Sequence, residues 1–512
     1  MTYEPLLPAR QHQAAALSAS RAKRYFALRM AQRVGKTKVV LDNYGELELA
    51  GQCKDLLVIA PAGAYREWET EVSKHCSRDL QHRAMVLTWA SKATSQIAQR
   101  LEAAFMAHSG PRVLLMNVEA LSTVQRARAL CRAFIGPQCM LAVDESTTIK
   151  NPASKRSRFV LEHLGPRVGW RRILTGLIAP RSPLDLFAQY KFLDTSILGY
   201  DNIISFKRRY AIEEFVCMWP NEQLTAMLAQ RGVRVNGMDR LQMLATLRRY
   251  TYVPMISIVK GYQHEDELYQ KTAPHSYRAT LAECYDMPAK QYMIRNVTMT
   301  TEQARLYREL RDFATTELAS MDHVTATHVL TRMLRLHQIL CGHTKDEQGN
   351  VHAVPSNRVT ALLDLLEEIE GKVVIWCSYQ YDVQQISVAL RAAYGDLAVV
   401  HFWGGNVPTR EEEQRRFQTD PQVRFMVATP SAGGRGRDWA VADTVIYYSN
   451  TDNLEYRMQS EERAQAVGKR NSVAYIDLMV PNTVDKIFVQ NMRDKINMST
   501  RIDGANYIEW LI

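Results

Sequence analysis

The stretch RYFALRMAQRVGKTKVVLDNYGELELA, residues 24–50, decides the fold class. Its first seven residues form an apolar run of strand length, and the segment from the lysine of GKT onward has the length and composition of a helix that ends at Gly51. A strand that leads into a helix is the unit from which parallel sheets are built. The loop between them, QRVGKTK at 32–38, places backbone N–H groups at a helix N-terminus, where phosphate oxygens can bind.

Short apolar runs of the same kind recur along the chain and predict an α/β fold with two parallel-sheet lobes. The predicted strands cover residues 24–30, 56–61, 113–118, 139–145, 171–176, 372–378, 397–402, 424–429, 443–449 and 472–480. Helical periodicity dominates between the two groups, and a long helix is expected to begin near residue 300. The expected domains are an N-terminal lobe at 1–195, a mainly helical insertion or bridge at 196–354, and a C-terminal lobe at 355–512.

The composition is that of a globular protein with sizeable cores. Of 512 residues, 46% are hydrophobic and 23% charged, which excludes a disordered chain and a fibrous repeat. The net charge of +10 favours a polyanionic partner such as nucleic acid without requiring one. We find no signal peptide and no apolar run near the ~18 residues that cross a bilayer, so we expect a cytoplasmic protein that does not bind membranes.

The eight cysteines stand singly, with no CxxC pair that could supply two zinc ligands from one loop. A disulfide framework is not expected in so long a chain with so few cysteines. Most of these thiols are therefore predicted to be inert core residues.

The GKT segment contains the candidate phosphate-binding residues. Gly35 lets the backbone approach a phosphate, Lys36 would pair with the β and γ oxygens, and Thr37 would offer its hydroxyl to Mg²⁺. Lys38 completes the candidate nucleotide-binding set. An ordinary capped turn is the alternative, because so short a match arises by chance and Met30 stands where the full P-loop pattern has its first glycine.

A second candidate element is AVDESTTIKNP at 142–152, an apolar strand that ends in two adjacent carboxylates. At the C-terminal edge of a parallel sheet, Asp144 could hold Mg²⁺ while Glu145 orients and deprotonates an attacking water. The alternative is that Asp144 only caps the following turn.

GKT and DESTTIKN occur in this order about a hundred residues apart, as in superfamily 2 helicases. The chain resembles the Snf-type, chromatin-remodeller-like translocases in the compact form typical of bacteriophage genomes. Further segments resemble motifs Ia, Ib, III, IV, V and VI of that family. They are APAGAYREWETEV (60–72), NVEALS (117–122), LTGLIAPRSPLDLFAQYKFLD (174–194), VVIWCSY (373–379), TPSAGGRGRDWAVADTVIYYSN (429–450) and QSEERAQAVG (459–468).

The resemblance implies two RecA-like lobes with ATP and Mg²⁺ in the cleft between them. The first lobe would hold the phosphates and the metal, and the second would supply an arginine to the γ-phosphate. The matching positions in motif VI are Gln459 and Arg463. The alternative role of Arg463 is a salt bridge on a helix surface with one of three acidic residues, namely Glu461, Glu462 or Asp477.

Two further sets of contacts follow from the resemblance. Gln13, favoured over Gln11, matches the glutamine that recognises adenine, although either could be a solvated residue of a first helical turn. Candidate nucleic-acid contacts, which would touch phosphates without reading sequence, are Lys150, Ser431, Gly433, Gly434 and Arg435. The Arg- and Tyr-rich clusters at 207–210 and 247–252 could add charge and stacking, or could be solvated helix faces. Trp68 and Trp376 are expected in the core.

Several positions depart from the family pattern. Ala466 stands where motif VI has its second arginine, and Lys469 or Arg470 could compensate. Leu177 and Ile178 replace the second threonine and the proline of motif III, Arg181 stands where asparagine is common, and Arg33 occupies a glycine position of the P-loop.

The leading hypothesis is an ATP-dependent, Mg²⁺-requiring DNA translocase or helicase that is a monomer or a weak oligomer. Two alternatives stay open. One is a DNA-binding or scaffold protein of the same fold with weakened hydrolysis, which the departures in motifs III and VI would explain. The other is a helicase that acts on RNA, because grooves that track phosphates do not by themselves distinguish the two sugars.

Overall fold

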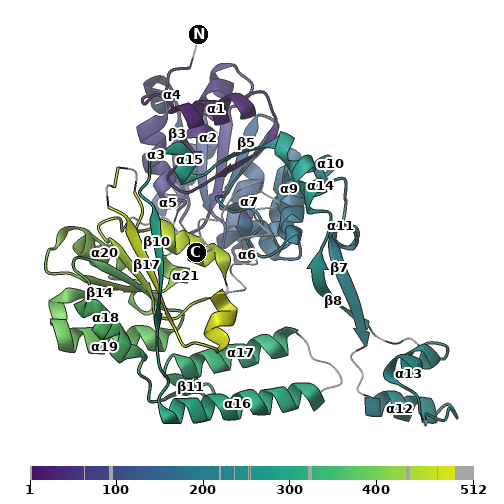
Figure 1. Cartoon of the computed structure of the whole chain (residues 1–512). Coiled ribbons are helices and arrows are strands. Elements are labelled where there is room, and N and C mark those ends of the chain that lie inside the picture. The colour runs from purple at the N-terminus through teal and green to yellow at the C-terminus, as the bar shows by residue number, and fades with distance from the viewer. Residues whose placement is uncertain are drawn as a thin grey trace.

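Two parallel sheets form the centres of two lobes in the computed structural model (Figure 1). The structure describes residues 3–62, 64–90, 96–217, 221–235, 237–251, 253, 255–320, 326–346, 348–433, 439–451, 453–466, 468–469 and 471–489. All ten predicted strands are present, each within two residues of its expected bounds. Among the described helices, none combines the length and apolar character that crossing a membrane requires.

The first lobe contains a seven-stranded sheet in the order β3-β4-β2-β5-β6-β1-β9. Its strands are β1 (Tyr25–Met30), β2 (Asp55–Ala60), β3 (Met85–Thr88), β4 (Arg112–Asn117), β5 (Cys139–Asp144), β6 (Trp170–Leu174) and β9 (Ser276–Ala279). Its helices are α1 (Gln11–Ser20), α2 (Lys36–Leu49), α3 (Glu67–His75), α4 (Arg78–Arg83), α5 (Gln96–Ala107), α6 (Ala120–Thr123), α7 (Gln125–Phe134), α8 (Lys155–Arg158) and α9 (Leu186–Leu193).

Helices cover both faces of this sheet, so each strand is buried on both sides. In β2, Leu57 and Ile59 belong to one hydrophobic cluster while Leu56 and Val58 belong to another. A strand buried on both faces is apolar at every position rather than at alternate ones. This is why continuous apolar runs located the strands correctly.

The second lobe contains a six-stranded sheet in the order β10-β17-β16-β13-β15-β14. Its strands are β10 (Lys290–Asn296), β13 (Val373–Trp376), β14 (Val399–Phe402), β15 (Phe425–Ala428), β16 (Thr444–Tyr447) and β17 (Val473–Met479). Its helices are α18 (Arg358–Glu367), α19 (Gln380–Tyr394), α20 (Arg410–Thr419), α21 (Pro430–Gly433) and α22 (Leu454–Glu462). All neighbouring strands in both sheets pair in parallel.

The segment 196–354 does more than bridge the lobes, because it also supplies one edge strand to each sheet. β9 pairs with β1 of the first sheet, and β10 pairs with β17 of the second. Neither strand was predicted, since β9 is short and polar and β10, KQYMIRN, is only partly buried. The helices of this segment are α10 (Thr195–Leu198), α11 (Ile203–Tyr210), α12 (Asn221–Ala229), α13 (Arg240–Leu247), α14 (Glu265–Thr272), α15 (Leu281–Cys284), α16 (Thr301–Ser320) and α17 (Ala326–Leu340).

A hairpin arm projects from the first lobe within this segment (Figure 1). It consists of the antiparallel strands β7 (Ala211–Cys217) and β8 (Met255–Tyr262), with α12 and α13 at its tip. The tip has a small hydrophobic cluster of its own, which includes Leu224, Leu228 and Leu247. A second, two-stranded hairpin joins β11 (His343–Lys345) to β12 (Val351–Ala353).

A buried ion pair attaches the end of the segment to the second lobe. Arg358, at the start of α18, lies 3.1 Å from the carboxylate of Asp485 and donates to the carbonyl oxygen of Tyr448 at 2.7 Å. His337 of α17 lies 3.2 Å from the same carboxylate. Because a buried arginine must be paired and hydrogen-bonded, these contacts fix α17 and α18 against the second sheet.

The expectation for the cysteines is confirmed. All eight thiols are free, and each is buried except Cys284, which is half-buried. Burial raises the pKa of Cys53 and Cys131 to about 12, so these thiols stay protonated and unreactive near neutral pH.

Candidate nucleotide site

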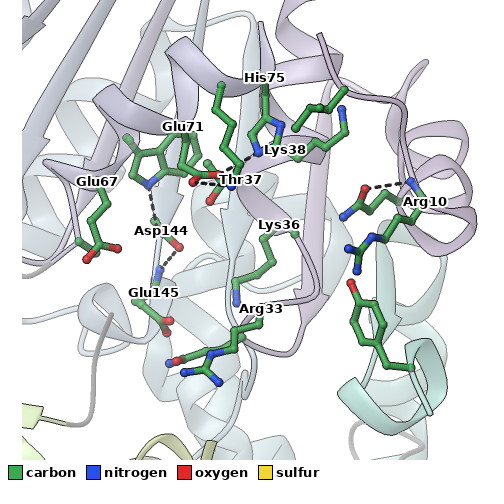
Figure 2. Close-up of a pocket in the computed structure, with 18 of the residues that line it drawn as sticks. Arg10, Arg33, Lys36, Thr37, Lys38, Glu67, Glu71, His75, Asp144 and Glu145 are labelled. Carbon is green, nitrogen blue, oxygen red and sulfur yellow. Dashed lines mark hydrogen bonds and ion pairs between the residues drawn. The ribbon is translucent and has the colours of Figure 1, made fainter. Parts of the chain in front are cut away.

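A cavity of about 680 Å³ opens at the C-terminal edge of the first sheet (Figure 2). Its lining comes from the loop before α2, from α1 and α3, and from the end of β5. Arg463 of the second lobe also lines it, so the cavity lies between the lobes. Pockets at the carboxyl ends of parallel strands are the usual ligand sites of such sheets.

The GKT loop forms one wall of the cavity. Gly35 has a φ of +94°, and a Cβ atom built on it would lie 2.2 Å from Nε2 of Gln13. Glycine is therefore favoured by the backbone conformation, and a larger residue would also displace the end of the Gln13 side chain. The Lys36 ammonium donates to the carbonyl oxygens of Met30 at 3.0 Å and Ala31 at 3.3 Å, which holds it at the entrance of the loop.

Thr37 and Lys38 lie in the first turn of α2 and also line the cavity, but their side chains differ in exposure. Lys38 forms a buried ion pair with Asp42, 2.7 Å away on the next turn. The charge of Lys38 is thus already compensated within the helix. Lys38 is buried, whereas Thr37 is half-buried. The nucleotide-binding role of Lys38 stays a prediction.

The two carboxylates at the end of β5 face the same cavity. Asp144 accepts a hydrogen bond from Nε1 of Trp68 at 3.0 Å and one from the N–H of Glu145 at 2.9 Å. The alternative that Asp144 caps the next turn is wrong, because that turn, Ser146–Ile149, has Glu145 at its N-cap position and no side-chain cap. Glu145 itself has a φ of +46°, a conformation that non-glycine residues adopt rarely and mostly at functional sites.

The residues at this point suit a magnesium ion. Each Asp144 oxygen accepts one hydrogen bond and keeps lone pairs for a metal or its water shell, and Thr37 lines the same cavity. Magnesium is usually held by one or two carboxylates together with substrate phosphates and water, not by a cage of protein ligands. The described residues contain no group of three or more His, Cys, Asp or Glu that could hold a metal.

Arg463 reaches the cavity from the end of α22. Its Nε donates to the carbonyl oxygen of Gln459 at 3.1 Å, and its Nη2 contacts Oε1 of Gln32 in the GKT loop. Burial lowers the pKa of Arg463 to about 10; the carboxylate of Glu462 opposes this shift and the guanidinium of Arg33 adds to it. Arg463 is therefore still charged at neutral pH and lies in contact with the first lobe.

A second, smaller cavity of about 20 Å³ lies between Glu145 and Gln459. Its lining also includes Gln32 and Glu455. Within the described part of the chain, Oε1 of Gln459 has no hydrogen-bond partner. The cavity also has apolar lining residues, Leu177 and Met458, and it is large enough for one water molecule between Glu145 and Gln459.

The comparisons with known proteins agree with this geometry. Residues 24–345 match the model of the SNF2-related domain, and residues 357–468 match the helicase conserved C-terminal domain. This chain belongs to the SNF2-related family. The recognition of the Snf-type family and of two RecA-like lobes from the sequence motifs is thus confirmed.

Individual relatives of this SNF2-related chain are distant. A DNA repair and recombination protein of Saccharomyces cerevisiae is 22% identical over 480 residues, or 90% of this chain and 45% of its own length. An uncharacterized ATP-dependent helicase of Mycoplasma genitalium is 24% identical over 48% of this chain and 24% of its own. This chain therefore spans less than half the length of these curated relatives. The Sulfolobus solfataricus SWI2/SNF2 ATPase core in complex with dsDNA has a TM-score of 0.40 and 18% identity, and the match covers 100% of this chain and 97% of that one.

The position of Arg463 in the SNF2-related chain depends on a residue that the motifs did not indicate. Arg457, six residues earlier in α22, pairs with Glu461 at 2.7 Å and with Asp477 of β17 at 2.6 Å. Two of the three acidic residues considered as partners of Arg463, namely Glu461 and Asp477, are thus paired with Arg457. The carboxylates that act on the pKa of Arg463 are those of Glu462, Glu145 and Glu67.

The far end of the cavity contains Gln13. Its side chain is buried, donates to the carbonyl oxygen of Val34 at 3.2 Å and accepts from the N–H of Arg10 at 3.0 Å, whereas Gln11 is exposed. The Arg10 guanidinium lies 5.0 Å from the ring centroid of Tyr285, and both line the cavity. The sequence did not predict Tyr285 as a lining residue, because no local pattern indicates that residue 285 lies beside α1.

The predicted nucleic-acid residues have varied environments. Ser431 is exposed on α21, while Lys150 lies 3.5 Å from Glu455 and 3.8 Å from Asp185 in a largely buried ion-pair group. A Cβ on Gly433 would lie 2.4 Å from the Trp439 ring, so tryptophan packing by itself requires glycine there. Gly434 and Arg435 lie outside the described residues.

The tryptophans and the basic clusters can also be placed. Trp68 and Trp376 are buried as expected. In the cluster at 207–210, Lys207 and Arg209 pair with Glu213 and Glu267, each at 2.6 Å. In the cluster at 247–252, Arg248, Arg249 and Tyr250 are exposed at the tip of the arm, and residue 252 lies outside the described residues.

The departures from the SNF2 pattern now have structural explanations. Lys469 donates to the carbonyl oxygens of Ala440, Ala442 and Ala464 at 2.6–3.0 Å and pairs with Asp443 at 2.8 Å. It is therefore committed to its own lobe and does not replace the arginine missing at Ala466; Arg470 lies outside the described residues.

The unusual motif III brings an apolar residue to the lobe boundary. Leu177 packs against Leu454 and Met458 of α22, and these three residues form a hydrophobic cluster that spans the two lobes. Nearby, Glu455 of α22 accepts a hydrogen bond from Thr147 at 2.9 Å. α22 is thus the element through which the second lobe contacts the first.

Proposed function

We propose that this chain is an ATP-dependent DNA translocase or helicase that hydrolyses ATP in the cleft between its lobes. The observation that carries the proposal is that Arg463 of the second lobe lines the same cavity as Lys36, Thr37 and Asp144 of the first. A polyphosphate placed there would be held by both lobes, so its hydrolysis would change how they contact each other. The names of two relatives, an ATP-dependent helicase and a DNA repair and recombination protein, support this activity.

The residues have distinct roles in the proposed reaction. Lys36 and the backbone around Gly35 bind the phosphates, and Gln13 lies at the end where the base would bind. When Mg²⁺ is bound, Thr37 and Asp144 would hold it, and it would neutralise charge on the phosphate oxygens.

The water that attacks ATP would occupy the small cavity between Glu145 and Gln459. Its oxygen forms a bond to the γ-phosphorus, its proton passes to the Glu145 carboxylate, and the bond to the β–γ bridging oxygen breaks with the electron pair leaving on ADP. Arg463 stabilises the negative charge of the transferring group. The Gln459 side chain, whose oxygen has no partner among the described residues, would orient the water by accepting its second hydrogen.

DNA is the proposed substrate along which the lobes move. Each cycle of cleft closure and opening would shift one lobe relative to the other and step the protein along a strand. The net charge of +10 is suited to a polyanion but does not separate DNA from RNA. RNA is therefore included as a substrate in the test.

The test is ATP turnover measured with single-stranded DNA, duplex DNA, branched DNA and RNA. We expect DNA to stimulate turnover, and Lys36→Ala and Glu145→Gln to lower the stimulated rate at least about 100-fold, because each removes a group that acts on the transition state. Lys74→Ala is the matched control, because this exposed lysine lines the rim of the same cavity and pairs with Glu71 only at 3.7 Å. Equal rates for wild type, Lys36→Ala and Glu145→Gln would exclude the assigned site.

A DNA-binding protein with weakened hydrolysis is the second candidate. It is favoured by Ala466, which carries no charge, and by Lys469, which is bound within its own lobe. Tight ATP binding with no DNA-stimulated turnover in the same assay would support this candidate over the first.

A further inference from the structure

Arg33 has an unusual backbone conformation within the GKT loop. Its φ is +63°, in the left-handed region where glycine is favoured and long side chains are rare. Residues held in this conformation cluster at functional sites, because the surrounding structure must enforce it. Glycine would adopt this conformation without strain, so the presence of arginine here points to a role for its side chain.

The Arg33 side chain points into the nucleotide cavity. It lines the cavity with Lys36 and Arg463, and Figure 2 shows it beside Lys36 and below Glu145, away from Arg10. Its Nη2 donates to the backbone carbonyl oxygen of Arg463 at 3.4 Å, across the lobe boundary. Arg33 is thus a first-lobe residue at the end of the cavity where the second lobe enters.

Several positive charges converge at this end of the cavity. Arg33 is one of the groups that lower the pKa of Arg463 below its usual value, after burial itself. Placing Lys36, Arg33 and Arg463 around one space costs electrostatic repulsion, which a bound polyanion would turn into attraction. Acidic groups face the same space: Glu462, Glu145 and Glu67 act on Arg463, and Asp144 also lines the cavity.

The second lobe supplies little additional positive charge to this space. Among the described residues that line the cavity, Arg463 is the only one from the second lobe. Ala466 is uncharged, and Lys469 is bound to carbonyl groups of its own lobe. Among the described residues, the further cation beside Arg463 and Lys36 at this end of the cavity is therefore Arg33 of the first lobe.

We propose that Arg33 binds the terminal phosphate of ATP from the first lobe, beside Arg463, and acts as a second arginine in hydrolysis. This inference rests on the proposed ATPase function and adds a phosphate-binding residue to it. Because a planar guanidinium can bind two phosphate oxygens at once, Arg33 would hold the transferring group in one orientation. Its bond to the Arg463 carbonyl would make the contact between the lobes sensitive to whether that phosphate is present.

The test compares Arg33→Gly and Arg33→Lys with wild type in binding and in turnover. Binding is measured for ADP and for the non-hydrolysable analogue adenylyl imidodiphosphate, in the presence of Mg²⁺. For Arg33→Gly we expect ADP affinity within about twofold of wild type, analogue affinity reduced about tenfold, and DNA-stimulated turnover reduced about 100-fold. Arg33→Lys should be intermediate, because lysine retains the charge but not the two-point geometry.

The melting temperature separates this role from a structural one. Glycine relieves the left-handed conformation, so Arg33→Gly should melt at or above the wild-type temperature while losing activity. Arg10→Ala is the matched control, since it removes an arginine from the other end of the cavity and should weaken ADP and the analogue equally. If Arg33→Gly fails to fold, Arg33→Lys gives the decisive ratio of analogue to ADP affinity.

Two results would overturn the inference. One is unchanged analogue affinity and turnover in Arg33→Gly, and the other is an equal loss of affinity for ADP and the analogue. If Lys36→Ala abolishes turnover while Arg33→Gly does not change it, only the role of Arg33 is wrong. If wild type shows no turnover with any nucleic acid, the proposed ATPase function is wrong, and the ratio of affinities still tests whether Arg33 binds a terminal phosphate.

Discussion

The groups assigned to hydrolysis are held in place by residues outside the motifs that identified them. The indole of Trp68 donates to Asp144, and Arg457 fixes α22 to β17 so that Arg463 enters the cleft. Arg457 also lies with its guanidinium 3.4 Å from the centroid of the Tyr447 ring. A hydrogen bond or ion pair that orients a functional side chain contributes to activity as much as to stability.

Tyr285 is a residue-scale test of the nucleotide end of the cavity. Its ring contacts Arg10 and packs edge-on against His12 at 5.3 Å, so it offers an aromatic surface at the end where Gln13 lies. We expect Tyr285→Ala to weaken ATP and ADP binding about five- to tenfold, because one aromatic contact contributes about 1–1.5 kcal/mol to binding. The maximal rate should change little.

Tyr285→Phe is the control, because it keeps the ring and removes only the hydroxyl. Calorimetric titration with ADP measures the affinity directly. Wild-type affinity in Tyr285→Ala would show that the base does not bind against this ring, whereas a loss in both variants would point to the hydroxyl instead.

At the scale of elements, α22 and the loop after β6 determine how the lobes meet. Leu177 of that loop packs on Leu454 and Met458 of α22, where the SNF2 pattern has threonine. The same helix bears Gln459 and is followed directly by Arg463, so an apolar contact lies next to the residues proposed to act in hydrolysis. The unusual motif III is therefore a packing feature of the interface and does not by itself indicate loss of function.

Leu177→Ala should loosen the contact between the lobes without unfolding either one. Losing a buried leucine at a contact costs about 2–3 kcal/mol, which would shift the ratio of contacting to separated lobes by roughly 30- to 150-fold. We expect a larger radius of gyration in small-angle scattering of the nucleotide-free protein, and an unchanged melting temperature.

Leu241→Ala is the matched control, because this leucine is 77% exposed on the arm and does not belong to the apolar cluster between the lobes. Identical scattering curves for Leu177→Ala and wild type would show that the apolar cluster does not determine lobe contact.

At the scale of the whole molecule, the arm is a separately packed unit attached to the first lobe. Its tip has its own hydrophobic cluster, and its exposed surface includes Arg231, Arg234, Arg248 and Arg249. A hairpin that bears such a tip adds little to the cores of the lobes, because its buried residues contact one another.

Replacing residues 218–254 with a short Gly–Ser turn should leave the lobes folded and ATP binding unchanged. Unfolding followed by circular dichroism should keep its midpoint within about 2 °C, because none of the described residues removed belongs to the core of either lobe. Duplex DNA binding should weaken and become less dependent on salt, since phosphate contacts release counterions in proportion to their number.

A variant with the four exposed arginines changed to glutamine removes the positive charge of the arm but keeps the arm itself. Comparing it with the deletion shows whether the charge accounts for DNA binding by the arm. If DNA affinity and its salt dependence match wild type in both variants, the arm does not contact DNA. A fall in the melting midpoint of the deletion alone would show that the tip supports the first lobe.

The sequence determined the ten predicted strands, the two lobes, the GKT loop and the acidic pair. Strands buried on both faces are apolar at every position, and Gly35, Lys36, Asp144 and Glu145 lie in short motifs whose chemistry depends on local spacing. The tertiary structure decided what depends on segments far apart in the chain. It joined β9 and β10 to the two sheets, brought Tyr285 to the cavity and committed Lys469 to its own lobe. These contacts join residues up to hundreds of positions apart, and local periodicity and propensity carry no information about such pairings.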